Sequence, residues 1–306
     1  MRARLGIAPI AWTNDDLPEL GGNTPLEACL SEARAAGFSG IETGGKFPDN
    51  AEELGPILAE HELSICGGWY SGTVLGNDLE AEKDRVWAQL AMFRELNAPC
   101  LVYGETTETI QDKRKTPLHE RPRLDDDQMR IYGRHLTSFA EWCAESGMPI
   151  ALHHHMGTVI ESEGDIDCIM NWTGEAVDLL FDVGHLAFAG GRILPTLERH
   201  VGRIAHFHAK DVRRTVTDQL DRNHESFLDA VLKGAFTVPG DGDLDFLPCV
   251  KCLADHGYEG WFVVEAEQDP VQAPPLEYAR IGFQTMQNHL LEAGYEILDI
   301  HKIDSN

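Results

Sequence analysis

Short apolar runs alternate with helix-like segments along most of the chain. Eight runs have the character of buried strands, at residues 5–10, 39–44, 63–69, 100–104, 149–155, 179–185, 204–210 and 261–267. Eight strands that alternate with helices over this length predict an α/β protein in which residues 1–306 form one closed (β/α)8 TIM barrel. A doubly wound open sheet is the alternative, but no glycine-rich phosphate-binding loop follows the first run.

Helix boundary signals agree with this pattern. In residues 23–37, Asn23 or Thr24 is a candidate N-cap, Pro25 falls in the first turn and Gly37 ends the helix. Residues 125–147 begin with acidic side chains, which suit the positive end of a helix dipole. Two long connections, residues 104–127 and 211–246, follow the fourth and seventh runs. We expect both on the face where barrel enzymes build their sites.

The chain is strongly acidic, with 25 Lys and Arg against 51 Asp and Glu and a formal net charge of −26. Such a surface repels phosphate backbones and anionic lipids, so we expect no nucleic-acid or membrane partner. No apolar run approaches the ~20 residues that span a bilayer, and the N-terminal segment lacks signal-peptide features. A homo-oligomer is left open and would need a patch outside the acidic surface.

Seven cysteines are scattered along the chain. An odd number in a long chain is typical of reduced thiols, so we expect a cytoplasmic location. Cys249 and Cys252 form a C-x-x-C pair inside a helix-like segment, but no second pair accompanies them. We therefore expect no zinc or redox site there.

The stretch PIALHHHMGTVIES carries a strand-like run directly into three histidines. Because a strand alternates its faces, His153 and His155 share one side, whereas His154 points away and is expected to pack or to support the site. Polar pairs also end the next three runs, namely Asp182 with His185, His206 with His208, and Glu265 with Glu267. The carboxyl ends of barrel strands converge, and buried charges without a partner are costly. The pattern predicts a metal site, with the ligand from each pair left open, and suits Mn²⁺, Co²⁺, Fe²⁺ or Zn²⁺.

Other polar and aromatic residues end the earlier runs on the same face. They are Trp12, Thr13 and Asn14 after the first run, Glu42 and Lys46 at the second, Trp69 and Tyr70 at the third, and Tyr103 and Glu105 at the fourth. Lys210 and Asp211 similarly follow the seventh run. An aromatic wall with several hydrogen-bonding groups favours a polyhydroxylated ring as ligand. Filling of the core is an equal alternative for Trp69.

Seven motifs resemble one branch of the xylose-isomerase-like barrels, the inosose dehydratases of myo-inositol catabolism. They are APIAWTNDDLPELGG, GFSGIETGGKFP, HHHMGT, FDVGH, HFHAKDVR, FTVPGDGDLDF and GWFVVEAEQDP, and they extend from near residue 5 to near residue 290. The resemblance implies metal ligation by His153, Asp182, His208 and Glu265. Many relatives carry a glutamate where His153 falls, and His155 is the alternative ligand from that run. A histidine would lower the negative charge at the ion and remove a carboxylate that epimerases use as a base.

The implied activity is a metal-dependent hydro-lyase reaction. Water is eliminated from 2-keto-myo-inositol, a small polyhydroxylated ring ketone, to give a trihydroxycyclohexane-1,2-dione. The expected cofactor is Mn²⁺ or Co²⁺, with Zn²⁺ or Fe²⁺ as alternatives. The candidate acids and bases are His155, His185, Lys210 and Glu267, and the candidate substrate-binding residues are Trp12, Asn14, Glu42, Lys46 and Trp69.

Three other functions fit the same scaffold. A metal-dependent sugar isomerase or epimerase shares the enediolate chemistry and is the principal alternative. A DNA-repair endonuclease would bring more metal ligands and a basic groove, which the net charge of −26 argues against. A non-catalytic sugar-binding protein is disfavoured, because binding alone does not require a converged metal site.

Overall fold

The computed structural model describes residues 1–76 and 78–299, and parallel strands form a closed barrel at its centre. The barrel strands are β1 (Arg2–Ile7), β2 (Gly40–Thr43), β3 (Ser64–Gly72), β4 (Leu101–Glu105), β5 (Ile150–His153), β6 (Val177–Asp182), β7 (Ile204–Ala209) and β10 (Gly260–Val264). The last strand pairs in parallel with the first, from Ala3 opposite Gly260 to Ile7 opposite Val264. This closure confirms the predicted (β/α)8 barrel and excludes the open sheet.

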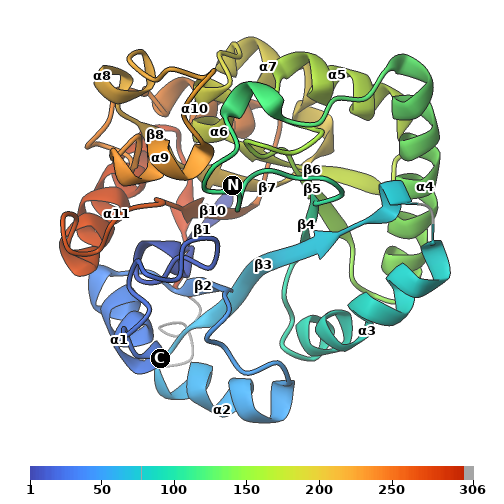
Figure 1. The fold of residues 1–306 in the computed structure, drawn as a ribbon. Coiled ribbons are helices and arrows are strands. Elements are labelled where there is room, and N and C mark those ends of the chain that lie inside the picture. Colours follow the sequence, from blue (N-terminus) through green and yellow to red (C-terminus); the bar gives the residue numbers. More distant parts are fainter. Residues whose placement is uncertain (77, 300–306) are drawn as a thin grey trace.

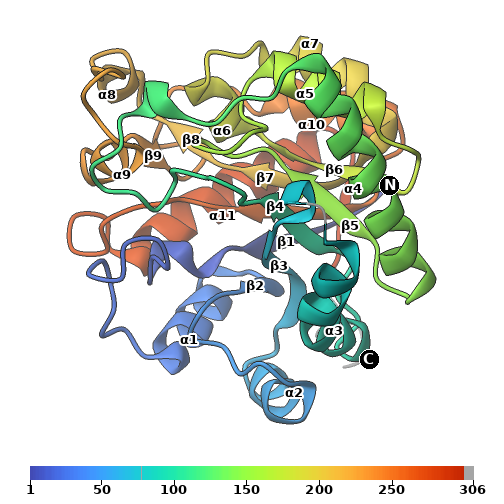
Figure 2. The same cartoon turned by 45° about the vertical axis from the view of Figure 1, so that its right-hand side comes forward.

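Helices form an outer ring around the strands (Figures 1 and 2). They are α1 (Leu26–Ala36), α2 (Ala51–Glu60), α3 (Leu79–Glu95), α4 (Asp126–Glu145), α5 (Glu163–Trp172), α6 (Val183–Phe188), α7 (Ile193–His200), α8 (Arg214–Thr217), α9 (Phe227–Leu232), α10 (Leu247–Asp255) and α11 (Pro275–Glu292). Within residues 1–76 and 78–299, none of these helices has the length and apolar character needed to cross a membrane.

Smaller elements decorate the barrel. The short strands β8 (Asp211–Val212) and β9 (Phe236–Thr237) pair in antiparallel fashion within the long connection after β7. They lie beside α8 and α9 (Figure 2). A further strand, β11 (Glu296–Ile297), pairs in parallel with β1. Single 3-10 turns, η1 (Pro9–Ala11), η2 (Val74–Gly76), η3 (Leu118–Glu120) and η4 (Val201–Arg203), complete the described elements.

The first helix begins later than the sequence predicts. Pro25 occupies the N-cap position in an extended conformation, so neither Asn23 nor Thr24 caps α1. The predicted end is confirmed, because Gly37 takes a left-handed φ of 115°. A Cβ at Gly37 would lie 2.7 Å from the ring of Phe283, so close packing as well as backbone conformation requires glycine there.

The strands end earlier than the apolar runs do. β5 stops at His153, so His154 and His155 lie in the following loop, and β10 stops at Val264, just before Glu265. His185 lies on α6 rather than in β6. The residues past these strand ends are mainly polar and make no further ladder pairs, so the predicted runs overestimate strand length by a few residues.

A tryptophan ring fills the floor of the barrel, with the guanidinium of Arg4 over it at 5.6 Å from the ring centre. Trp261 on β10 packs across the interior against Gly6 and Gly40, where a Cβ would lie 3.3 Å and 2.3 Å from its ring. Trp261 belongs to a buried cluster that also contains Cys66. Glycines on β1 and β2 thus admit one large ring that closes the amino-terminal end of the barrel, and polar side chains are left to occupy the carboxyl-terminal end.

Candidate metal centre and active site

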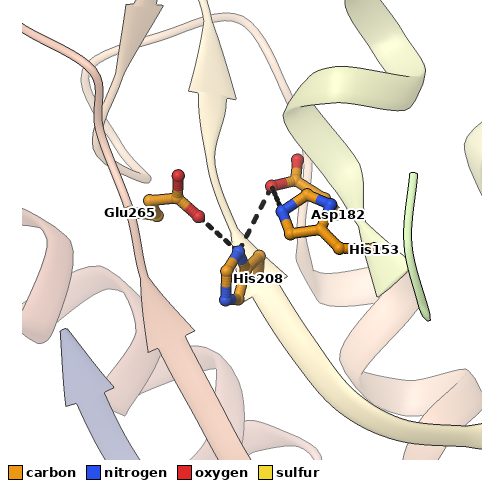
Figure 3. Close-up of side chains that lie close together, drawn as sticks. All are labelled: His153, Asp182, His208 and Glu265. Atoms are coloured by element: carbon orange, nitrogen blue, oxygen red, sulfur yellow. Dashed lines mark ion pairs between the residues drawn. The ribbon is translucent and has the colours of Figure 1, made fainter. Parts of the chain in front are cut away.

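Four side chains from neighbouring strands converge at the carboxyl end of the barrel (Figure 3). His153 ends β5, Asp182 ends β6, His208 lies in β7 and Glu265 follows β10. Asp182 Oδ2 lies 3.4 Å from His208 Nδ1 and 3.8 Å from His153 Nε2, and Glu265 Oε2 contacts His208 Nδ1. One ligand atom of each residue lies within 4.8 Å of those of the other three.

Both imidazoles are oriented through their second nitrogen. His153 Nδ1 lies 2.7 Å from the carbonyl oxygen of His154, which can only accept, so Nδ1 carries the proton and Nε2 keeps its lone pair. His208 Nε2 donates to Glu42 Oε1 at 3.0 Å, which leaves Nδ1 to face the cluster. Hydrogen bonds of this kind fix the tautomer and the ring orientation of metal-binding histidines.

Both carboxylates are held in the same manner. Asp182 Oδ1 accepts from the backbone N–H of His185 at 2.8 Å, as the N-cap of α6. Glu265 Oε1 accepts from Lys210 Nζ at 2.8 Å. Each carboxylate therefore has one oxygen anchored by the protein and the other directed to the common point.

The atoms at that point face one another without regular hydrogen bonds. Asp182 Oδ2, His208 Nδ1 and Glu265 Oε2 are buried, form ion-pair contacts with one another and make no hydrogen bond of regular geometry. Orphaned buried polar atoms of this kind are costly and rare. Burial alone would lower the pKa of His208, but Glu42 and Glu265 outweigh it and raise the pKa well above its usual value, so the surroundings favour positive charge. Two imidazole nitrogens and two carboxylate oxygens fit a divalent cation at this position.

A second polar cluster lies beside the first. Lys210 Nζ is 2.7 Å from Glu267 Oε1 and 2.7 Å from His185 Nε2. His155 Nε2 lies 3.9 Å from Glu267 Oε1, and the rings of His155 and His185 have centroids 3.9 Å apart. Phe236 covers Lys210, with the ammonium 4.9 Å from the ring centre. The structure thus brings together all four predicted acid–base candidates.

Burial sets the protonation states of this cluster. Burial raises the pKa of Glu267 to about 7, against the opposing effect of Lys210. Burial also lowers the pKa of His155 to about 4, and Lys210 acts in the same direction. Burial would lower the pKa of Lys210 as well, but Glu265 and Glu267 outweigh it and raise that pKa. A neutral imidazole therefore lies close to a charged ammonium at neutral pH.

A cavity opens in front of both clusters. His153, His155, His208 and Glu265 form its inner wall. The loops after β1, β2 and β4 and residues of β2, β3 and β4 form the rest. Their lining residues include Thr13, Asp15, Asp16, Thr43, Gly44, Trp69, Val102 and Gln111. Of the second cluster, His155 lines this cavity, whereas His185, Lys210 and Glu267 lie behind it, fully buried.

Comparisons with known proteins agree with this geometry. The family described as xylose isomerase-like TIM barrel matches residues 30–289. The chain is 45% identical over 304 residues to a rhizopine catabolism protein, MocC, of Rhizobium meliloti, covering 99% of this chain and 94% of that one. It is 43% identical over 280 residues to an inosose dehydratase of Geobacillus thermodenitrificans, covering 91% and 94%. The chain belongs to the xylose isomerase-like TIM barrel family.

Solved structures of distant relatives share the barrel. The IOLI protein with a binding zinc atom has a TM-score of 0.70 at 14% identity, covering 95% of this chain and 99% of that one. An L-ribulose 3-epimerase has a TM-score of 0.66 at 15% identity, covering 95% of each chain. At such low identity the likeness supports the fold of this xylose isomerase-like barrel and nothing finer.

The structure brings some predicted substrate-binding residues to the cavity and others elsewhere. Trp69 lines the cavity, with its ring 5.5 Å from those of both His153 and His155. Glu42 also lines it, but its carboxylate is engaged with His208 Nε2 and, at 2.9 Å, with His206 Nε2. Burial alone would raise the pKa of Glu42, but His208 and His206 outweigh it and lower it to about 2. Glu42 is thus a partner of the metal-centre histidine.

Three of the substrate-binding candidates lie outside the described lining of this cavity. Trp12 is buried, and its Nε1 donates to Glu32 Oε2 at 2.7 Å. Asn14 Oδ1 accepts from the backbone N–H groups of Asp16 and Leu17, both at 2.9 Å. Their proximity in sequence to the first strand end does not specify side-chain direction, because a loop has no fixed alternation.

Lys46 is the third of these candidates. Its Nζ donates to the carbonyl oxygens of Gly22, at 2.7 Å, and of Thr24. The ammonium therefore ties the loop after β2 to the loop after β1. The ammonium thus uses two of its three N–H donors on carbonyls of one loop, and Lys46 is not among the residues that line the cavity.

Sequence reasoning missed several residues of the cavity wall, and two of them, Asp16 and Gln111, contact each other. Asp16 follows Asn14 in the WTNDD block, and Gln111 lies in the long connection after β4. Gln111 Nε2 donates to Asp16 Oδ2 at 3.2 Å. The available signal was the polar block itself, but which of its members faces the cavity depends on the turn that Asn14 builds.

Proposed function

We propose that this chain is a metal-dependent inosose dehydratase, which eliminates water from 2-keto-myo-inositol to give a trihydroxycyclohexane-1,2-dione. The observation that carries the proposal is the convergence of His153, Asp182, His208 and Glu265 beside a neutral imidazole, that of His155, at a polar cavity. The identity of 43% to an inosose dehydratase over 91% of the chain supports this choice among the reactions of the family.

Four side chains of this chain would hold the cation: His153, Asp182, His208 and Glu265. A divalent cation there supplies Lewis acidity, which makes the C–H bond next to a bound ketone more acidic. Mn²⁺ or Co²⁺ is our preferred ion, and Zn²⁺ or Fe²⁺ is compatible with the same ligand types.

His155 is the proposed acid–base catalyst. Its Nδ1 lies 2.8 Å from the carbonyl oxygen of Met156, so Nδ1 holds the proton and the lone pair of Nε2 is free. The low pKa of about 4 keeps the ring neutral near pH 7. Nε2 can therefore accept the proton of the α-carbon, and a group of this type contributes ~10²–10⁴-fold to the rate.

The elimination needs only the substrate ring and the imidazole of His155 to account for all protons and electrons. The electrons of the broken C–H bond form the double bond to the β-carbon, and the C–O bond of the β-hydroxyl breaks. His155 returns its proton to the departing hydroxyl, which leaves as water. The enol that remains tautomerises to the 1,2-dione. Glu267 lies behind this step, and its carboxylate, 3.9 Å from His155 Nε2, would stabilise the transient positive charge on the ring. Lys210 opposes that charge and holds the Glu267 carboxylate in place at 2.7 Å.

A mass measurement tests the proposal. Purified protein with Mn²⁺ or Co²⁺ is incubated with 2-keto-myo-inositol, and the product should be lighter by one water. In D₂O the ketonised product should also take up deuterium, and an exhaustive chelator should stop the reaction.

The principal alternative, a sugar isomerase or epimerase, leaves the substrate mass unchanged. An unchanged mass in the metal-loaded protein, beside an active control enzyme, would refute the dehydratase proposal. Loss of water that persists after the chelator would refute the role of the metal while leaving the reaction class intact.

A further inference from the structure

The loop after β1 places one carboxylate in the cavity wall away from the metal centre. Asp16 lines the cavity and accepts one side-chain hydrogen bond, from Gln111 Nε2 to its Oδ2 at 3.2 Å. Among the residues that the structure describes, no donor is recorded for Asp16 Oδ1. This oxygen is therefore available to a ligand in the cavity.

Both sides of this contact are anchored. Asn14 Oδ1 accepts from the backbone N–H of Asp16 at 2.9 Å and fixes the turn from which the carboxylate projects. On the other side, Ile110 N donates to the carbonyl of Gly157 at 3.0 Å, and Thr109 Oγ1 donates to the same carbonyl at 3.1 Å. The Asp16–Gln111 pair thus joins the loops after β1 and β4, and it is held before any ligand arrives, which lowers the entropy lost on binding.

The charge of the wall indicates what kind of ligand fits. Asp15, Asp16, Glu42 and Glu265 line the cavity, and within its described lining there is no lysine or arginine. At the part of the wall formed by Asp15 and Asp16, away from the metal centre, an anionic group such as a phosphate ester would meet carboxylates with no lysine or arginine beside them. Burial raises the pKa of Asp16 to about 6, so its charged form gains from any further donor. Hydroxyl groups carry no negative charge and can donate a hydrogen bond to Asp16, so they suit this wall.

We propose that Asp16, positioned by Gln111 and Asn14, accepts a hydrogen bond from a hydroxyl of the substrate ring remote from the ketone, and that it selects uncharged polyhydroxylated ring ketones. This inference rests on the proposed function and adds a specificity-determining residue to it. The hydrogen bond would orient the ring so that the ketone faces the metal centre and the α-carbon faces His155.

The test compares wild type with Asp16→Ala on 2-keto-myo-inositol and on a panel of its mono-deoxy analogues. A hydrogen bond to a charged acceptor corresponds to about a tenfold to hundredfold effect. For Asp16→Ala we expect KM for the parent ketone to rise by that factor, with kcat changed by less than ~3-fold and bound metal unchanged. The analogue that lacks the hydroxyl bound by Asp16 should have a higher KM than the parent ketone in wild type. In Asp16→Ala, the KM values of this analogue and of the parent ketone should be equal.

Two further variants keep the result interpretable. Asp16→Asn retains an acceptor oxygen and should fall between wild type and Asp16→Ala. Glu19→Gln makes the same charge change on an exposed position of the same loop and should behave as wild type.

The outcomes separate this inference from the proposed function. No dehydration by wild type would overturn the function itself. Normal dehydration by wild type, with Asp16→Ala keeping wild-type KM or keeping the full penalty for every deoxy analogue, would overturn the role of Asp16. A uniform rise in KM for all analogues would indicate a merely structural role and would also overturn it.

Discussion

The two halves of the barrel mouth differ in how their polar side chains are used. Strands β5, β6, β7 and β10 present imidazoles, carboxylates and one lysine, nearly all fully buried and bonded to one another. The loops after β1, β2 and β4, with Trp69 of β3, present hydroxyl, amide and carboxylate groups around an aromatic ring. Electrostatic interactions between charged groups are stronger where water is excluded than where the groups are exposed to solvent. We infer that one half carries out the chemistry and the other recognises the ring.

Glu42 is an exception to this division by strands. It belongs to β2, in the recognition half, but its carboxylate crosses the interior to His208 and His206 on β7. The division therefore follows side-chain direction rather than strand number. The roles of the two halves can be distinguished by measuring both the bound metal and the turnover of each variant.

The largest effect is expected from a metal ligand. Asp182→Asn keeps the oxygen that caps α6 but removes the charge of the oxygen that faces the cluster. We expect bound metal to be lost and kcat/KM to fall by ~10⁴-fold or more, because Lewis-acid stabilisation amounts to several kcal/mol. Metal content by mass spectrometry, circular dichroism and turnover measure the three consequences.

Asp178→Asn is the matched control for that variant. Asp178 lies on the same strand but is partly exposed and outside the cluster. It should retain metal and activity. Retained metal in Asp182→Asn, or equal losses in both variants, would contradict the assignment of Asp182 as a ligand.

The next effect separates acid–base chemistry from metal binding within the same half. His155→Asn should lower kcat by ~10²–10⁴-fold, since it removes the imidazole while an amide can still donate to the Met156 carbonyl. Bound metal should stay at the wild-type level, because His153 supplies the ligand from β5. Metal lost together with activity would instead identify His155 as the ligand.

A smaller effect is expected from the residue that links the halves. Glu42→Gln removes the charge that orients His208, and partners of this kind affect metal affinity or activity by ~10–100-fold. We expect weaker Mn²⁺ binding by titration calorimetry, with kcat largely restored at saturating metal. If affinity is unchanged but KM for the ketone rises, Glu42 binds substrate, as the sequence alone suggests.

The strand order and the ligand set illustrate what a sequence can specify. Eight apolar runs with polar residues at their carboxyl ends suffice for the barrel, because parallel strands bring those ends together wherever the helices lie. That is why polar residues that end four neighbouring runs lie together in the structure, and His153, Asp182, His208 and Glu265, the ligands that the family resemblance implies, are among them. A cytoplasmic location, the identity of the metal and the absence of nucleic-acid and membrane partners stay predictions.

The recognition half was less predictable because its residues lie in loops. Trp12 and Lys46 lie in the loops after β1 and β2, but the ring nitrogen of Trp12 donates to Glu32 and the ammonium of Lys46 donates to backbone carbonyls. Asp16 reaches the cavity only through the turn at Asn14, together with a glutamine from a distant loop. Side-chain direction in such loops depends on long-range contacts that no local pattern contains.

The smallest effect on turnover is expected from the middle histidine of the triplet. His154 is fully buried in the loop that follows β5, and its Nε2 accepts from the backbone N–H of Asp182 at 3.1 Å. Burial lowers its pKa to about 3, so it is neutral and can act as an acceptor at all physiological pH values. His154→Ala removes a packed ring and leaves that N–H unsatisfied, which should lower the free energy of unfolding by about 2–4 kcal/mol in urea titrations. Turnover at saturating Mn²⁺ should fall by less than ~10-fold, because Asp182 keeps its own cap on α6. His154→Gln offers an acceptor oxygen and should recover part of the stability. A loss of turnover in His154→Ala as large as that in Asp182→Asn would mean that His154 itself takes part in the chemistry, and the division between the two halves would have to be redrawn.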